Sequence, residues 1–237
     1  MFGYGYFGYI VFMFPALLLG LWAQFLVKSR FEKFSKVMSS RGITGADAAR
    51  MVLNAGGVYN VPINRVAGHL SDHYNPKTNS ISLSDSVHSS RSVAAIGVAA
   101  HEAGHALQYA NNYAPIKMRM AIIPFCNIGS MLGPVLIMVG FVISYGAEAT
   151  ASLGAMLYLL GIVLFSGVAL FQLVTLPVEL NASRRAMKAL ESGFVLEGKE
   201  LDGARKVLTA AALTYIAALV SSIMQILYYA TRFRPRD

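Results

Sequence analysis

The sequence His101-Glu102-Ala103-Gly104-His105 is the pattern in this chain that most directly suggests chemistry. On a helix, residues four positions apart lie on the same face, so His101 and His105 can direct imidazole nitrogens at one metal ion. Glu102 then flanks the open coordination position. Zinc lowers the pKa of a bound water, and a carboxylate beside that water can accept its proton as the water attacks a peptide carbonyl. The pattern therefore predicts a zinc hydrolase with Glu102 as the base.

The residues around the motif are small and uncharged. From Val93 to Ala110 the chain is rich in alanine and predicts a helix that is buried behind an active site. The simpler interpretation is that the two histidines and Glu102, paired with an arginine, belong to the core. We favour a metal because burying three ionisable groups without a metal or another partner is costly.

A catalytic zinc usually has three protein ligands, so another carboxylate must complete the site. Glu179 follows an apolar stretch, and its alternative role is an ion pair with Arg184 or Arg185. Asp202 lies in Leu-Asp-Gly, which resembles the Asp-bearing motif of site-2-type intramembrane proteases. Charged residues surround Asp202, whereas that motif needs an apolar segment, so we favour Glu179. Ser183, one helical turn after Glu179, could orient a ligand.

The other histidines lack helical partner spacing and are expected in loops, although His73 could line the cleft. These histidines are His69, His73 and His88. Three residues could stabilise an oxyanion, and the sequence does not choose among them. They are Arg184, Arg185 and Tyr109.

The composition predicts a membrane protein. Hydrophobic residues make up 55% of the 237 residues and charged residues 14%, so apolar surface must face lipid. One cysteine, Cys126, excludes a disulfide framework and a four-cysteine zinc site. The net charge of +8 is spread between apolar stretches without a nucleic-acid-binding motif, so anionic lipid headgroups explain it better than nucleic acid does.

Four uncharged stretches are long enough to cross a bilayer. We read the first as a retained anchor, since it lacks a basic start and a cleavage site. No ionisable residue lies inside these stretches, which argues against a transporter. The predicted parts are a transmembrane helix (1–27), a catalytic part with the motif helix (28–120), a transmembrane hairpin (121–178), a ligand-bearing helix and loop (179–206), a transmembrane helix (207–231) and a basic tail (232–237).

The distribution of basic residues predicts the orientation. The segment 28–120 contains eleven Lys or Arg and the segment 179–206 contains six, whereas the turn at Gly146 contains none. The positive-inside rule therefore places both large loops in the cytoplasm. The basic tail would then be outside, which the same rule disfavours.

The first large loop contains further predicted elements. Thr44-Gly45-Ala46-Asp47 begins a capped amphipathic helix that ends at glycine 56. Residues 58–70 alternate weakly, residues 72–79 are rich in turn formers and residues 80–84 alternate cleanly, which predicts a β-hairpin.

Three segments carry a resemblance over essentially the full length of the chain. They are GHLSDHYNP at 68–76, AAHEAGHALQ at 99–108 and LPVELNASRRA at 176–186. With them the chain resembles the neutral zinc metallopeptidases of bacterial membranes known as the YugP-like family. More distantly it is similar to the HtpX-like and CAAX-processing membrane proteases.

The resemblance implies an α-helical membrane protein with about four transmembrane helices and a small α+β zincin-like (gluzincin) domain. It implies that His101, His105 and Glu179 hold one zinc ion. The distant relatives have an aspartate four residues after the glutamate, where this chain has Ser183. Substrates of such proteases lie along an edge strand, which we expect to be 80–84.

These observations predict a zinc metalloendopeptidase in the cytoplasmic membrane. It would cleave membrane or membrane-adjacent polypeptides at the cytoplasmic face, with Glu102 as base. One alternative is a site-2-like protease that uses Asp202. The other is a non-catalytic scaffold that binds zinc, although such a site would need no base.

Overall fold

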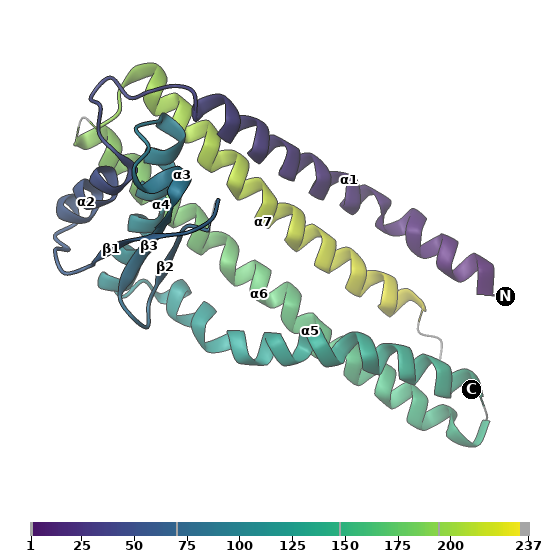
Figure 1. Cartoon of the computed structure of the whole chain (residues 1–237). Coiled ribbons are helices and arrows are strands. Elements are labelled where there is room, and N and C mark those ends of the chain that lie inside the picture. The colour runs from purple at the N-terminus through teal and green to yellow at the C-terminus, as the bar shows by residue number, and fades with distance from the viewer. Residues whose placement is uncertain (1, 70, 147, 194, 233–237) are drawn as a thin grey trace. The chain divides into compact units, whose positions relative to one another are not determined.

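The structure is a computed structural model that describes residues 2–69, 71–146, 148–193 and 195–232, with side chains from residue 7 onward. It is mostly helical, with one small sheet. Its elements, labelled in Figure 1, are α1 (Phe2–Phe34), α2 (Gly45–Ala55), β1 (Ile63–Val66), β2 (His73–Asn75), β3 (Ser80–Ser84), α3 (Asp85–His88), α4 (Val93–Ala110), α5 (Ala114–Gly146), the 3-10 turn η1 (Glu148–Thr150), α6 (Ala151–Ser192) and α7 (Gly198–Arg232).

The chain forms two compact units. The first consists of residues 1–21, 118–175 and 215–237, and the second of residues 22–117 and 176–214. Among the described residues, four helices are long and apolar enough to cross a membrane. Three of them contain predicted stretches, namely 121–145, 149–178 and 207–231, and the first, Phe7–Phe34, covers the predicted stretch from residue 7 to residue 27.

In the first unit, α5 and α6 approach each other closely through glycines. A Cβ atom added at Gly133 would lie 2.9 Å from the Cβ of Phe165, and one at Gly161 would lie 2.7 Å from the backbone nitrogen of Ile137. Small residues at such contacts are typical of membrane helices, which gain little from burying apolar side chains away from lipid.

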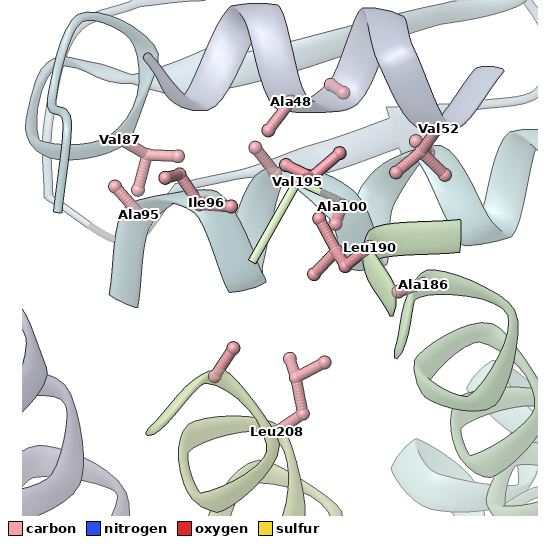
Figure 2. Packing of buried hydrophobic residues seen from close by; sticks show 14 of the residues in the cluster. Ala48, Val52, Val87, Ala95, Ile96, Ala100, Ala186, Leu190, Val195 and Leu208 are labelled. Carbon is pink, nitrogen blue, oxygen red and sulfur yellow. The ribbon is translucent and has the colours of Figure 1, made fainter. Parts of the chain in front are cut away.

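The second unit contains a hydrophobic core built around α4. Figure 2 shows Ala48 and Val52 of α2 next to α4, which carries Ile96 and Ala100. Leu190 of α6 belongs to the same cluster. The alanines are fully buried and allow the helices to pack closely. The core therefore fixes the helix that carries the motif.

Both α2 and α4 begin at side-chain caps, and the sequence predicts the one at Thr44. The Thr44 hydroxyl accepts a hydrogen bond from Asp47 N (3.2 Å), and Thr44 N donates to the Asp47 carboxylate (2.9 Å), which completes a capping box for α2. Ser92 caps α4 by accepting from Ala95 N at 3.2 Å. The predicted motif helix, Val93–Ala110, is confirmed.

The sheet has the strand order β1-β3-β2, which corrects two predictions. The expected hairpin between 58–70 and 80–84 is wrong, because β1 pairs with β3 in parallel, with Ile63 opposite Ile81. The hairpin partner of β3 is β2, which falls in the segment predicted as a turn. Residues 80–84 are likewise not an edge strand, since β3 is central and every one of its residues is buried.

Candidate metal centre

Two turns of α4 place both motif histidines on one face. His101 and His105 lie side by side, with ring centroids 4.7 Å apart and ring planes at 84°. The four-residue spacing accounts for this contact.

The third member of the site comes from α6. One carboxylate oxygen of Glu179, Oε2, lies 3.2 Å from His101 Nε2 and 3.4 Å from His105 Nε2. The Glu179 residue is only 3% exposed. These are the three residues among those described whose possible ligand atoms lie within 4.8 Å of one another.

The spacing of these atoms fits zinc. Ligand atoms about 2.0–2.1 Å from a zinc ion in tetrahedral geometry are roughly 3.4 Å apart. The distances of 3.2 Å and 3.4 Å between Glu179 Oε2 and the two Nε2 atoms are close to that value. Two imidazoles and one carboxylate are also the ligand set typical of catalytic zinc sites with an open fourth position.

Gly104, inside the motif, permits the close approach of α4 and α6. A Cβ atom at this position would overlap the backbone carbonyl oxygen of Ala182 and lie 3.2 Å from its Cα. Because Ala182 lies three residues after Glu179, this contact sets how near the ligand comes to the two histidines.

The tautomer of His105 follows from its neighbour Gln108, which is completely buried. The Gln108 amide nitrogen donates to Val178 O (2.7 Å) and to Asn181 Oδ1 (3.0 Å), which uses both of its hydrogens. The Gln108 oxygen, 3.0 Å from His105 Nδ1, must then accept. His105 therefore has its proton on Nδ1 and presents the Nε2 lone pair to the site.

The hydrogen bond that orients His101 is made by a hydroxyl group. Its Nδ1 lies 3.0 Å from the hydroxyl of Ser183, one turn beyond Glu179 on α6. The predicted contact of Ser183 with a ligand is thus present, but the hydroxyl is neutral and offers less stabilisation to an N–H donor than a carboxylate would.

The Glu102 carboxylate is oriented by a hydrogen bond from the sheet and not by His101, His105 or Glu179. Its Oε2 accepts a hydrogen bond from the backbone nitrogen of Tyr74 in β2 at 2.9 Å, and the residue is 9% exposed. The Tyr74 ring contacts the ring of Tyr109, with centroids 5.5 Å apart. The carboxylate is therefore oriented while it remains outside the set of three possible ligands.

The carboxylates of Glu102 and Glu179 change the pKa of His105. Burial by itself would lower the pKa of His105, but the hydrogen bond to Glu179 and the charges of Glu102 and Glu179 raise it above its ordinary value. The two carboxylates therefore favour positive charge at His105.

The remaining sequence candidates lie outside this cluster. Asp202 is exposed and accepts a hydrogen bond from Lys206 at 2.5 Å. The expectation that all three other histidines lie in loops is wrong for two of them, since His73 is an exposed residue of β2 and His88 is the last residue of α3. None of the three belongs to the described metal cluster. Arg185 donates to Asn181 Oδ1 at 2.8 Å and so supports the Gln108 network.

The sequence interpretation missed Gln108 and Asn181, which hold a ligand without binding metal. A signal was present, since Gln108 lies three residues after His105 on the same helix face and is polar in an apolar run. The role of Tyr74 had no such signal, because its backbone and not its side chain contacts Glu102.

Comparison with known proteins decides the family. Residues 9–234 match the family described as "Putative neutral zinc metallopeptidase". The chain belongs to this family. A relative of these metallopeptidases, described as "Putative membrane protease YugP" of Bacillus subtilis (strain 168), is 45% identical over 219 residues, which cover 92% of this chain and 93% of that protein. No solved structure matches the chain significantly. The resemblance predicted from the sequence is confirmed.

Proposed function

We propose that this chain is a membrane-embedded zinc metalloendopeptidase that cleaves membrane or membrane-adjacent polypeptides. In this proposal His101, His105 and Glu179 hold the metal, and Glu102 is the proton acceptor. The observation that carries it is a set of three ligand atoms at zinc-like spacing, beside a buried carboxylate that is oriented by a backbone amide.

Each residue has a distinct task. Zinc, when bound, supplies a Lewis acid that polarises the scissile carbonyl. Glu102 takes a proton from the attacking water and later returns it to the leaving amine. The amide of Tyr74 fixes one Glu102 oxygen, so the other oxygen remains for the proton. Gln108 and Ser183 keep the Nε2 atoms of the two histidines turned toward Glu179.

A structural zinc site is a poorer explanation. Such sites are usually closed by four protein ligands. Among the described residues the cluster provides three, and Glu102 lies next to it without being needed as a ligand. A ligand set with one open position and a nearby base suits hydrolysis.

The proposed location follows from α6. This helix contains the third apolar stretch and continues to Ser192, so Glu179 lies just beyond the end of that stretch. A site at this level would reach polypeptides at the membrane boundary. The excess of basic residues in the flanking loops supports a site on the cytoplasmic face of the cytoplasmic membrane.

The decisive experiment replaces Glu102 with glutamine in the full chain, purified in detergent and loaded with zinc. We expect Glu102→Gln to keep one zinc per chain and to lose about 10²- to 10⁴-fold in the rate of cleaving a denatured membrane polypeptide, as is typical for loss of a general base. Glu197→Gln, an identical change at an exposed position, is the matched control. Undiminished cleavage by Glu102→Gln would show that the assigned mechanism is wrong.

The ligand assignment has a separate test. Zinc content after gel filtration should fall in Glu179→Ala and remain at one per chain in Asp202→Ala, since Asp202 is exposed and paired with Lys206. The opposite result would favour the site-2-like arrangement.

A further inference from the structure

A groove lies between the C-terminal part of α6 and the first turns of α7, both within the second unit. Its volume is about 390 Å³, which is within the range of roughly 300–1,000 Å³ for small-molecule sites. Most of the residues that line the groove are basic or apolar. Arg184, Lys188 and Arg205 are basic, and Leu180, Leu208 and Ala212 are apolar.

The apolar residues lie mainly toward one end of the groove and the basic residues toward the other, with Met187 between Arg184 and Lys188. The lining residues run from 180 to 191 on α6 and from 205 to 212 on α7. Leu180 lies two residues past the uncharged stretch of α6, which ends at Val178, and Leu208 and Ala212 lie inside the uncharged stretch of α7, which begins at Val207. Lys188 and Arg205 are on the side away from those stretches. An amphipathic ligand would meet apolar surface toward the membrane and positive charge away from it.

The basic groups are available to a ligand. Arg184, Lys188 and Arg205 are exposed, and among the described residues no carboxylate lies within ion-pairing distance of them. Asp202, on the same helix as Arg205, is already paired with Lys206. Glu191 is the one acidic lining residue, so the groove has a net charge of +2.

We propose that this groove binds a phospholipid with an anionic headgroup. The phosphate contacts Arg184, Lys188 and Arg205, and an acyl chain lies along Leu180, Leu208 and Ala212. Anionic lipids attract basic residues near a membrane surface, and basic pockets between membrane helices suit their headgroups. The inference rests on the membrane location in the proposed function, but not on proteolysis.

Ser183 connects the groove to the metal centre. It lines the groove, and its hydroxyl lies 3.0 Å from His101 Nδ1. A bound lipid is therefore separated from a metal ligand by one side chain. For this reason Ser183 is left unchanged in the variants that test lipid binding.

The test uses native mass spectrometry of the full zinc-loaded chain in detergent. Phosphatidylglycerol and phosphatidylcholine with identical acyl chains are titrated separately, and inorganic phosphate and an acidic peptide are used as competitors. The groove variant is Arg184→Gln/Lys188→Gln/Arg205→Gln. A control variant with the same change in net charge, at exposed positions outside the groove, is Arg41→Gln/Lys77→Gln/Lys199→Gln.

We expect the wild type and the control variant to retain phosphatidylglycerol in preference to phosphatidylcholine. The groove variant should bind phosphatidylglycerol on the order of a hundredfold more weakly, because each basic group near an anionic headgroup contributes on the order of fivefold. Ala212→Phe, which fills the apolar end without changing charge, should also weaken binding. Equal zinc content in all variants shows that they are folded.

Three results would overturn the proposal. They are unchanged phosphatidylglycerol binding by the groove variant, equal binding of the two lipids by the wild type, and displacement of the lipid by inorganic phosphate or by the acidic peptide at equal concentration. Glu102→Gln separates this proposal from the enzymatic one, since it should bind phosphatidylglycerol as the wild type does. A failed protease assay therefore leaves the lipid result intact.

Discussion

Replacing Gln108 with methionine tests whether the buried network sets the affinity for metal. Methionine has a similar shape and is apolar, so it leaves little cavity. Three contacts are lost, but two of the partners keep others. Asn181 Oδ1 still accepts from Arg185, and Val178 O lies inside α6, where it accepts a helix hydrogen bond. The group left without a partner is the Nδ1–H of His105.

The expected magnitude follows from that one orphaned donor. Leaving a buried donor unpaired costs about 1–3 kcal/mol, and loss of such a support typically weakens metal binding about 10- to 100-fold. We therefore expect Gln108→Met to bind zinc about 10- to 100-fold more weakly than the wild type, measured by competition with a chelator of known affinity. Gln108→Glu keeps an acceptor for His105, but its second oxygen would face Val178 O and Asn181 Oδ1, which are both acceptors, so it should not restore the wild-type affinity.

A general loss of stability must be separated from a loss of orientation. Ile96→Val, in the buried core on the same helix, should cost about 0.5–1.5 kcal/mol of unfolding free energy without affecting zinc. The reasoning is refuted if Gln108→Met binds zinc as tightly as Ile96→Val does.

Two further predictions concern the elements that position the site. Gly104→Ala should lower the unfolding free energy by about 1–3 kcal/mol relative to Gly97→Ala, as measured by denaturant titration. The reason is that a Cβ at position 104 overlaps the backbone of Ala182, whereas a Cβ at position 97 meets the side chain of Ala204 at 3.3 Å. Both changes gain the same helix propensity, so equal stabilities would contradict this prediction. Asp47→Asn should destabilise the folded state near pH 7 by about 0.5–1 kcal/mol. The side-chain hydrogen bond from Thr44 lowers the pKa of Asp47 in the folded state, so this difference should be constant above about pH 4 and shrink as the pH falls through the lowered pKa; a difference that persists at pH 2 in thermal melts would argue against the charged cap.

Local patterns predicted the elements that depend on neighbouring residues. The capping box at Thr44 and the alanine-rich run from Val93 placed α2 and α4, because caps and helical periodicity are encoded within a few residues. The choice of Glu179 over Asp202 also rested on local sequence, namely the apolar stretch before the first and the charges around the second.

Long-range pairing was not accessible in this way. The alternation at 80–84 indicates a strand, but it does not say that the strand is central or that β1 runs parallel to it. The short strand β2 was hidden among turn formers, since its three residues are stabilised by pairing with β3 and by the contact between Tyr74 N and Glu102. Glu102 is 28 positions from Tyr74, so no short window of sequence around Tyr74 contains the information about that contact.

The candidate metal centre is formed by α4 and α6, so its geometry depends on how these two helices are aligned. Within five residues of α6, Glu179 lies beside the two motif histidines, Asn181 accepts a hydrogen bond from Gln108, and Ser183 contacts His101. A shift of α6 by a single residue, about 1.5 Å along its axis, would displace all three contacts at once. Gly104 is the point at which the two backbones touch, so it fixes the register of the ligands as well as the packing of the helices. The glycine within the motif is therefore as specific a requirement of this site as the histidines on either side of it.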